Sequence, residues 1–139
     1  TLPWMTFGYE IQIPPIYTLM FYNAIANGGK MIKPIFVKEI SKDGVIIETK
    51  KTETINPQIC TPKTLAQIQQ MLTDVVQKGT AGPVKSDYVK IAGKTGTAQI
   101  AQGAAGYRGN GKQHRVSFCG YFPADVICNL NTDHRRQAW

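Results

Sequence analysis

Apolar residues recur at helical spacing in two stretches of the chain. The first runs from Ile16 to Ile25, with Pro14-Pro15 before it and Asn27-Gly28-Gly29 after it. Proline suits the first turn of a helix and glycine the position just past its end. The pattern therefore predicts a helix with one apolar face, ending at Asn27-Gly28-Gly29.

The second helical stretch follows Thr61-Pro62. Thr61 suits an N-cap and proline the first helical position, and Gly79 suits the end. The apolar residues then form one stripe on a helix. They are Leu65, Ile68, Leu72, Val75 and Val76.

Runs rich in β-branched residues predict four strands. Met31 to Ile40 and Val45 to Glu48 flank Ser41-Lys42-Asp43-Gly44, which is favourable turn chemistry for a hairpin. Val89 to Ile100 and Val116 to Phe122 predict a second hairpin, whose connector is long, polar and rich in glycine. Helices mixed with hairpins favour an α+β fold, in which helices flank an antiparallel sheet.

The composition narrows the class of protein only slightly. The 139 residues suit one domain, and 16 Lys and Arg against nine Asp and Glu give a net charge of +7. Such a balance suits nucleic acid, an anionic lipid or an acidic wall polymer, but the basic residues are scattered and favour a solvated surface. No segment approaches the roughly 20 apolar residues of a membrane span.

The cysteines do not predict a metal site. The sequence has three cysteines, an odd number, and contains neither a Cys-x-x-Cys nor a His-x-x-x-His spacing. Their redox state stays open, and no metal site is expected. They are Cys60, Cys119 and Cys128.

The segment Ile91-Ala-Gly-Lys-Thr-Gly-Thr-Ala-Gln-Ile100 carries the candidate chemistry. Lys-Thr-Gly is a signature of serine β-lactamases and penicillin-binding proteins. Strand alternation places Thr95 and Thr97 on one face and Lys94 on the other. Gly96 permits close approach of a ligand, and the amide of Thr97 is suited to an oxyanion. We therefore predict Lys94 and Thr97 as catalytic residues, and Thr95, Gly96 and Thr97 as substrate-binding residues.

Further segments share a family pattern in the same order. They are Phe7-Gly-Tyr9, Tyr22-Asn-Ala-Ile-Ala-Asn-Gly-Gly29, Val75-Val-Gln-Lys-Gly-Thr-Ala81, Ala92 to Gln99 and Ser117-Phe-Cys-Gly-Tyr-Phe-Pro-Ala-Asp125. Together they resemble the C-terminal part of the transpeptidase domain of class B penicillin-binding proteins, and septal, division-type members most of all. The resemblance implies a partial β-lactamase/transpeptidase-like fold and no metal or organic cofactor. It assigns residues 1–125 to this domain and leaves 126–139 as an atypical tail.

The resemblance also implies a reaction. In this family a serine is acylated by a D-Ala-D-Ala stem peptide or by a β-lactam, and an amine of a neighbouring strand resolves the acyl-enzyme. The parent protein is expected to lie in the bacterial inner membrane by an N-terminal anchor, with a periplasmic catalytic domain and partners in the cell-division machinery.

The family's nucleophile motif is missing from this sequence. The three serines, Ser41, Ser86 and Ser117, are followed three places on by Gly44, Val89 and Gly120, so no Ser-x-x-Lys occurs, and no Ser-x-Asn occurs either. We therefore expect a fragment that is inactive alone.

Some residues near the motif invite a role. His114 would assist a substrate or simply be solvated. The connector residues would rim a substrate groove or form a solvated loop; they are Tyr107, Arg108, Lys112 and Arg115. Lys78-Gly79-Thr80 repeats part of the motif but falls at a helix end, where capping explains it. The connector's glycines form no phosphate cradle, since no helix follows them, and nucleic acid is not an expected partner.

Two alternative functions stay open. A D,D-carboxypeptidase or a β-lactam sensor would share the Lys-Thr-Gly motif. A non-enzymatic module that binds a wall polymer through its basic surface belongs to a different class.

Overall fold

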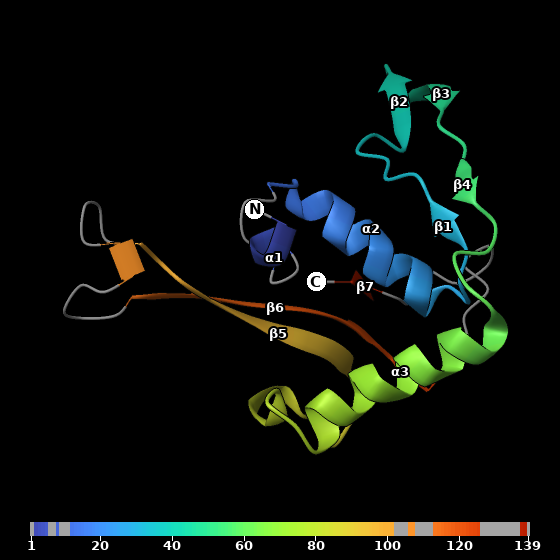
Figure 1. The fold of residues 1–139 in the computed structure, drawn as a ribbon. Coiled ribbons are helices and arrows are strands. Elements are labelled where there is room, and N and C mark those ends of the chain that lie inside the picture. The colour runs from blue at the N-terminus through green and yellow to red at the C-terminus, as the bar shows by residue number, and fades with distance from the viewer. Residues whose placement is uncertain are drawn as a thin grey trace.

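Two helices, four short strands, one long helix, a 3-10 turn and three further strands follow one another along the described residues. The structure is a computed structural model that describes residues 2–5, 8, 12–101, 106–107, 113–125 and 137–138. Figure 1 shows two long helices, α2 (Pro15–Ala26) and α3 (Pro62–Gln77), on opposite sides of a ribbon formed by β5 (Ala92–Gln99) and β6 (His114–Phe122), with smaller strands extending from one end. The predicted α+β class, an antiparallel sheet flanked by helices, is confirmed.

Helix α2, Pro15–Ala26, lies where the sequence predicted it. It ends in a Schellman arrangement, because the Gly29 amide donates to the Ala24 carbonyl at 2.8 Å and Gly28 has φ +66°. The expectation of one apolar face is wrong. Apolar side chains surround the helix, and Tyr17 and Phe21 remain 54% and 47% exposed.

Helix α3, Pro62–Gln77, also follows its prediction. The Thr61 hydroxyl accepts a hydrogen bond from the Thr64 amide at 3.2 Å, which satisfies a free donor of the first turn. Leu65 and Val76 are buried, so the apolar stripe faces the core.

The first predicted strand is divided between two strand pairs, of which only the second is a hairpin. β1, Met31–Ile32, pairs with β4, Thr54–Asn56, whereas β2, Glu39–Lys42, pairs with β3, Val45–Thr49. The β2–β3 turn is the predicted one, with Asp43 and Gly44 both at positive φ. Sequence periodicity missed β4 and the break after Ile32, because the pairing partner of β1 lies 22 or more residues further along the chain. Two short helices, α1 (Leu2–Met5) and a 3-10 turn (Gly82–Val84), were not predicted either.

The main sheet has the order β5-β6-β7. β5, Ala92–Gln99, and β6, His114–Phe122, form the predicted antiparallel hairpin, and β7, Gln137–Ala138, pairs with the end of β6. Most of the connector and residues 126–136 lie outside the described residues.

The core lies where one end of this sheet meets the two long helices. Ile25 and Ala26 of α2, Leu65 of α3, Ala92 of β5 and Tyr121 of β6 form one buried cluster. The C-terminal end of α2 is also tied to α3, since Gln69 donates through Nε2 to the carbonyl of Ile25 at 2.8 Å. These contacts fix the start of β5 and hence the strand that carries the Lys-Thr-Gly-Thr motif.

Candidate functional site

The Lys-Thr-Gly-Thr motif lies on β5, which is the edge strand of the main sheet among the described residues. Lys94 is opposite Cys119 and Gly96 is opposite Ser117. These residues line a cleft beneath α2, whereas the Thr95 hydroxyl bonds to Thr80 beyond the end of α3. Thr97 shares the face of Thr95, because side chains alternate along a strand. By the same alternation the Lys94 side chain leaves β5 on the other face, although its ammonium reaches back to Thr95.

The hydrogen-bonding alternation of β5 indicates which main-chain groups are open. The Ile100 amide donates to the carbonyl of Gln113 directly opposite, at 2.9 Å. In an antiparallel ladder such bonded pairs recur at every second residue. Gly96 and Lys94 therefore bond towards β6, while the N–H and C=O groups of Thr95 and Thr97 point to the outer edge.

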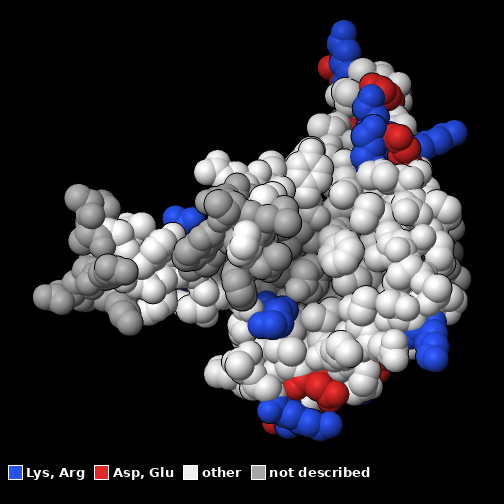
Figure 2. Space-filling view, in the orientation of Figure 1, with Lys and Arg blue, Asp and Glu red and all other residues white. Residues whose placement is uncertain are grey.

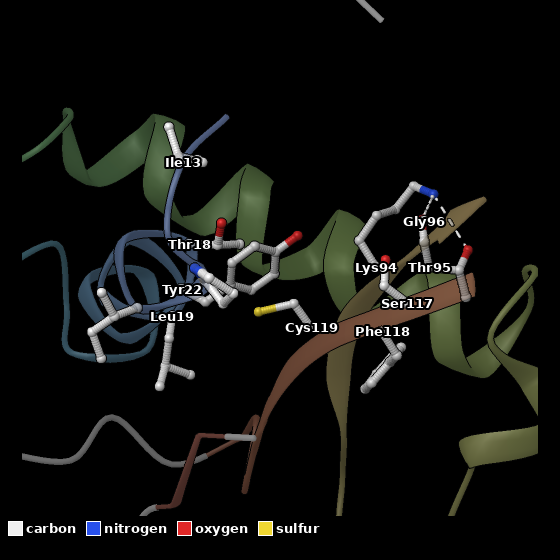
Figure 3. Close-up of a pocket in the computed structure, with 12 residues that line it drawn as sticks. Ile13, Thr18, Leu19, Tyr22, Lys94, Thr95, Gly96, Ser117, Phe118 and Cys119 are labelled. Carbon is white, nitrogen blue, oxygen red and sulfur yellow. Dashed lines mark hydrogen bonds between the residues drawn. The ribbon is translucent and has the colours of Figure 1, made fainter. Parts of the chain in front are cut away.

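Lys94 curls around this edge. Its ammonium donates to the Thr95 carbonyl at 2.8 Å and lies 3.5 Å from the Thr95 hydroxyl. Figure 3 shows the same reach from the strand towards Thr95. The arrangement concentrates a cation, a hydroxyl and outward-facing amides at one short stretch of strand.

Thr80 is the site residue that sequence reasoning missed. Its hydroxyl lies 2.9 Å from that of Thr95, although 15 residues separate the two in sequence. The prediction that capping explains Lys78-Gly79-Thr80 holds only in part, since the helix ends there but Thr80 reaches the motif. A repeated Gly-Thr was the only signal in the sequence, and it says nothing about proximity.

The cleft between α2 and the sheet has a volume of about 590 Å³. Figure 3 shows the ring of Tyr22 reaching from α2 towards Cys119. Burial raises the pKa of the Tyr22 phenol, and the nearby Cys119 raises it further. Burial also raises the pKa of the Cys119 thiol, so this wall of the cleft favours neutral groups. The cleft is lined by Ile13, Pro15, Ile16, Thr18, Leu19, Tyr22, Lys94, Thr95, Gly96, Ser117, Phe118 and Cys119.

The other predicted rim residues are only partly described. His114 and Arg115 lie on β6 opposite Gln99 and Ala98, and both are exposed. The Gln99 side chain donates to the carbonyl of Tyr107 at 2.9 Å, which holds that part of the connector near β5. Arg108 and Lys112 lie outside the described residues.

A family model described as the penicillin binding protein transpeptidase domain matches residues 3–129. The chain belongs to this family. Stage V sporulation protein D of Bacillus subtilis is 33% identical over 121 residues, and the match covers 86% of this chain and 18% of the relative. A peptidoglycan D,D-transpeptidase FtsI homolog of Mesostigma viride is 28% identical over 135 residues, covering 85% of this chain and 21% of the relative.

The fold agrees with the family. The solved D,D-transpeptidase domain of a peptidoglycan glycosyltransferase from Eggerthella lenta superposes with a TM-score of 0.61 at 28% identity, covering 76% of this chain and 23% of that one. The partial transpeptidase-like fold and the family predicted from the motifs are therefore confirmed. This transpeptidase-family chain spans about a fifth of the length of the curated relatives it matches.

The described surface of the transpeptidase-family chain shows mixed charge. On the face drawn in Figure 2, basic and acidic side chains gather together on the β2–β3 hairpin, and no continuous basic stripe crosses the described part of that face. None of the described helices is long and apolar enough to cross a membrane. Within the described residues, no three His, Cys, Asp or Glu side chains gather in a way that would hold a metal ion.

Proposed function

We propose that this chain is the substrate-holding part of a peptidoglycan D,D-transpeptidase. The observation that supports the proposal best is the outer edge of β5, where Thr95 and Thr97 direct main-chain groups outward beside the Lys94 ammonium. An extended stem peptide adds to such an edge as a further strand. Its terminal carboxylate is then held by the Thr95 and Thr97 hydroxyls and attracted by Lys94.

The Thr97 amide is the proposed oxyanion donor. An amide that points out of the sheet is fixed by the strand and needs no reorganisation when negative charge develops on a carbonyl oxygen. Loss of one such donor typically costs about 2.7–4 kcal/mol of barrier. Lys94 assists as a catalytic residue by easing proton movement at a nearby hydroxyl.

The nucleophile comes from outside this sequence. No Ser-x-x-Lys occurs in the chain, so the serine that is acylated belongs to another part of the whole protein. On this proposal, residues 1–125 form the C-terminal portion of the catalytic domain and 126–139 an atypical tail. The same serine reacts with β-lactams, which mimic the D-Ala-D-Ala end of the stem peptide. Septal peptidoglycan synthesis, contacts with the division machinery and a membrane anchor are proposed for the whole protein on the same resemblance.

Labelling with a fluorescent penicillin tests the proposal. We expect the whole protein, but not the chain alone, to carry the label on a denaturing gel. Lys94→Ala and Thr95→Ala should each reduce the rate of labelling by about tenfold or more, because each removes a hydrogen bond to a charged group.

Two exposed residues of the β2–β3 hairpin serve as controls. Lys42→Ala and Thr49→Ala remove the same side-chain types far from β5 in the sequence and should label at the wild-type rate. Unlabelled whole protein, or equal losses in all four variants, would count against the proposal. Salt-sensitive polymer binding without labelling would support a non-enzymatic module instead.

A further inference from the structure

Two threonine hydroxyls from distant parts of the chain meet beside Lys94. Thr80 and Thr95 lie 2.9 Å apart through their Oγ1 atoms, and either can donate to the other. Thr80 is exposed and Thr95 is partly exposed, so the pair lies at the surface, where a ligand can reach it. Such an exposed contact contributes little to the stability of the core.

Thr80 is held firmly by its surroundings. The Ala81 amide donates to the carbonyl of Val75 at 3.0 Å, and Ala81 itself is only 2% exposed. Gly79 packs so closely that a β-carbon there would lie 2.9 Å from the Val75 carbonyl oxygen. The turn after α3 therefore presents the Thr80 hydroxyl to β5 in a fixed position.

The proton count decides what this contact does when an anion binds. A threonine hydroxyl has one proton to donate and can accept two hydrogen bonds. A bound carboxylate only accepts, so it takes the single proton of Thr95. The Lys94 ammonium only donates, and it lies 3.5 Å from the same oxygen. Thr80 must then donate its own proton to Thr95.

We propose that Thr80 is a positioning residue, which orients the Thr95 hydroxyl and polarises it towards the carboxylate of the ligand. This inference rests on the proposed function, because it assigns Thr95 to carboxylate binding. With Thr80 donating from one side, the Thr95 proton is directed away from α3 and towards the ligand. A chain of hydrogen bonds also strengthens each member, since each donor polarises the next.

The test uses the whole protein that contains this chain, with two probes. One is a penicillin with its free carboxylate, and the other is the methyl ester of the same penicillin. Thr80→Val removes the hydroxyl and keeps the shape of the side chain. We expect it to slow acylation by the free acid about two- to tenfold, the range for one neutral hydrogen bond, and to leave the ester unchanged.

Rescue and coupling separate this role from a structural one. Thr80→Ser should restore the wild-type rate, and Thr80→Val should have no further effect in a Thr95→Val background. Thr64→Val is the matched control, because Thr64 and Thr61 form an equal hydroxyl pair at 2.9 Å at the other end of α3. It should not change either rate. Thr80→Ala replaces Thr80→Val if the valine variant does not fold.

Four outcomes would overturn the inference. Equal slowing of the acid and the ester, or a full additive loss in the double variant, would leave Thr80 with a structural role only. A normal rate in Thr80→Val together with a slow Thr95→Val would remove Thr80 and keep the proposed function. A normal rate in Thr95→Val would remove both Thr80 and the proposed role of Thr95.

Discussion

The hydroxyl of Ser117 occupies the space that a side chain at Gly96 would need. The two residues are opposite each other on β5 and β6, and a β-carbon at Gly96 would lie 2.5 Å from Ser117 Oγ. The glycine of the Lys-Thr-Gly motif therefore has a packing role inside the sheet as well as leaving room for a ligand. Because the obstructing atom is the end of the short Ser117 side chain, a side chain at position 96 would have to displace that hydroxyl.

Gly96→Ala should therefore impair the site through the sheet. The added methyl group forces the Ser117 side chain to rotate away, at a cost of about 0.5–1.5 kcal/mol. We expect penicillin acylation of the whole protein to fall by about two- to tenfold, because the displaced Ser117 side chain lines the same cleft as Lys94 and Thr95. Stopped-flow or gel labelling measures the rate.

The second variant makes this prediction specific. Gly96→Ala combined with Ser117→Ala removes the obstructing hydroxyl and should recover part of the lost rate. Gly82→Ala is the control, since nothing lies within 4 Å of the added β-carbon. A double variant as slow as Gly96→Ala would show that Ser117 is not the obstacle.

The glycine pair after α2 gives a prediction about stability. Gly28 has φ +66° with open space around it, whereas Gly29 has φ +91° and a β-carbon there would lie 2.8 Å from Gln58 Nε2. A left-handed backbone costs a residue other than glycine about 1–2 kcal/mol. Gly28→Ala should lower the free energy of unfolding by about that amount, and Gly29→Ala should lower it further. Urea unfolding of the whole protein compares them, and equal losses would mean that the Gln58 contact is unimportant.

The hydrogen bond from Gln69 of α3 to the Ile25 carbonyl of α2, here called the Gln69 bridge, should contribute measurably to the free energy of unfolding. Gln69→Leu removes the hydrogen bond to the Ile25 carbonyl and leaves that half-buried acceptor at the end of α2 without its partner. We expect a loss of about 1–3 kcal/mol, the cost of an unsatisfied polar group. Gln67→Leu, at an exposed position of the same helix, should change the free energy of unfolding far less. Similar losses in both would argue against the bridge.

Cys119 should react slowly with thiol reagents until the solution is strongly alkaline. Burial raises its pKa above the ordinary value of 9.0, so the thiol stays protonated at neutral pH and the reactive thiolate is scarce. Alkylation followed by peptide mass spectrometry should place the midpoint of Cys119 reactivity above pH 9. Because the unfolded thiol ionises first, the contribution of Cys119 to the free energy of folding is fully present below pH 9.0 and is lost as the pH rises through the higher native pKa. A midpoint below pH 9 would contradict the prediction, and Cys119→Ser confirms which peptide reports it.

Local sequence determined much of this protein. Pro15 marks the start of α2 and Gly28 follows its end, Thr61 caps the start of α3, and Asp43-Gly44 forms the turn of the β2–β3 hairpin. Each of these signals acts within a few residues of the backbone that it shapes. The Lys-Thr-Gly-Thr strand and the family were predicted in the same way, from neighbouring residues read in order.

The tertiary structure alone decided the contacts between distant segments. The β1–β4 pairing, the approach of Thr80 to Thr95 and the Gln69 bridge to Ile25 all join residues that no local pattern relates. Apolar spacing predicted α2 but not the exposure of Tyr17 and Phe21, since burial depends on what packs against each side. Hydrogen-bonding preference and side-chain period act along the chain and are encoded locally. Proximity across the fold depends on how the elements pack together around Ala92 and Tyr121, and that is fixed only when the whole chain has folded.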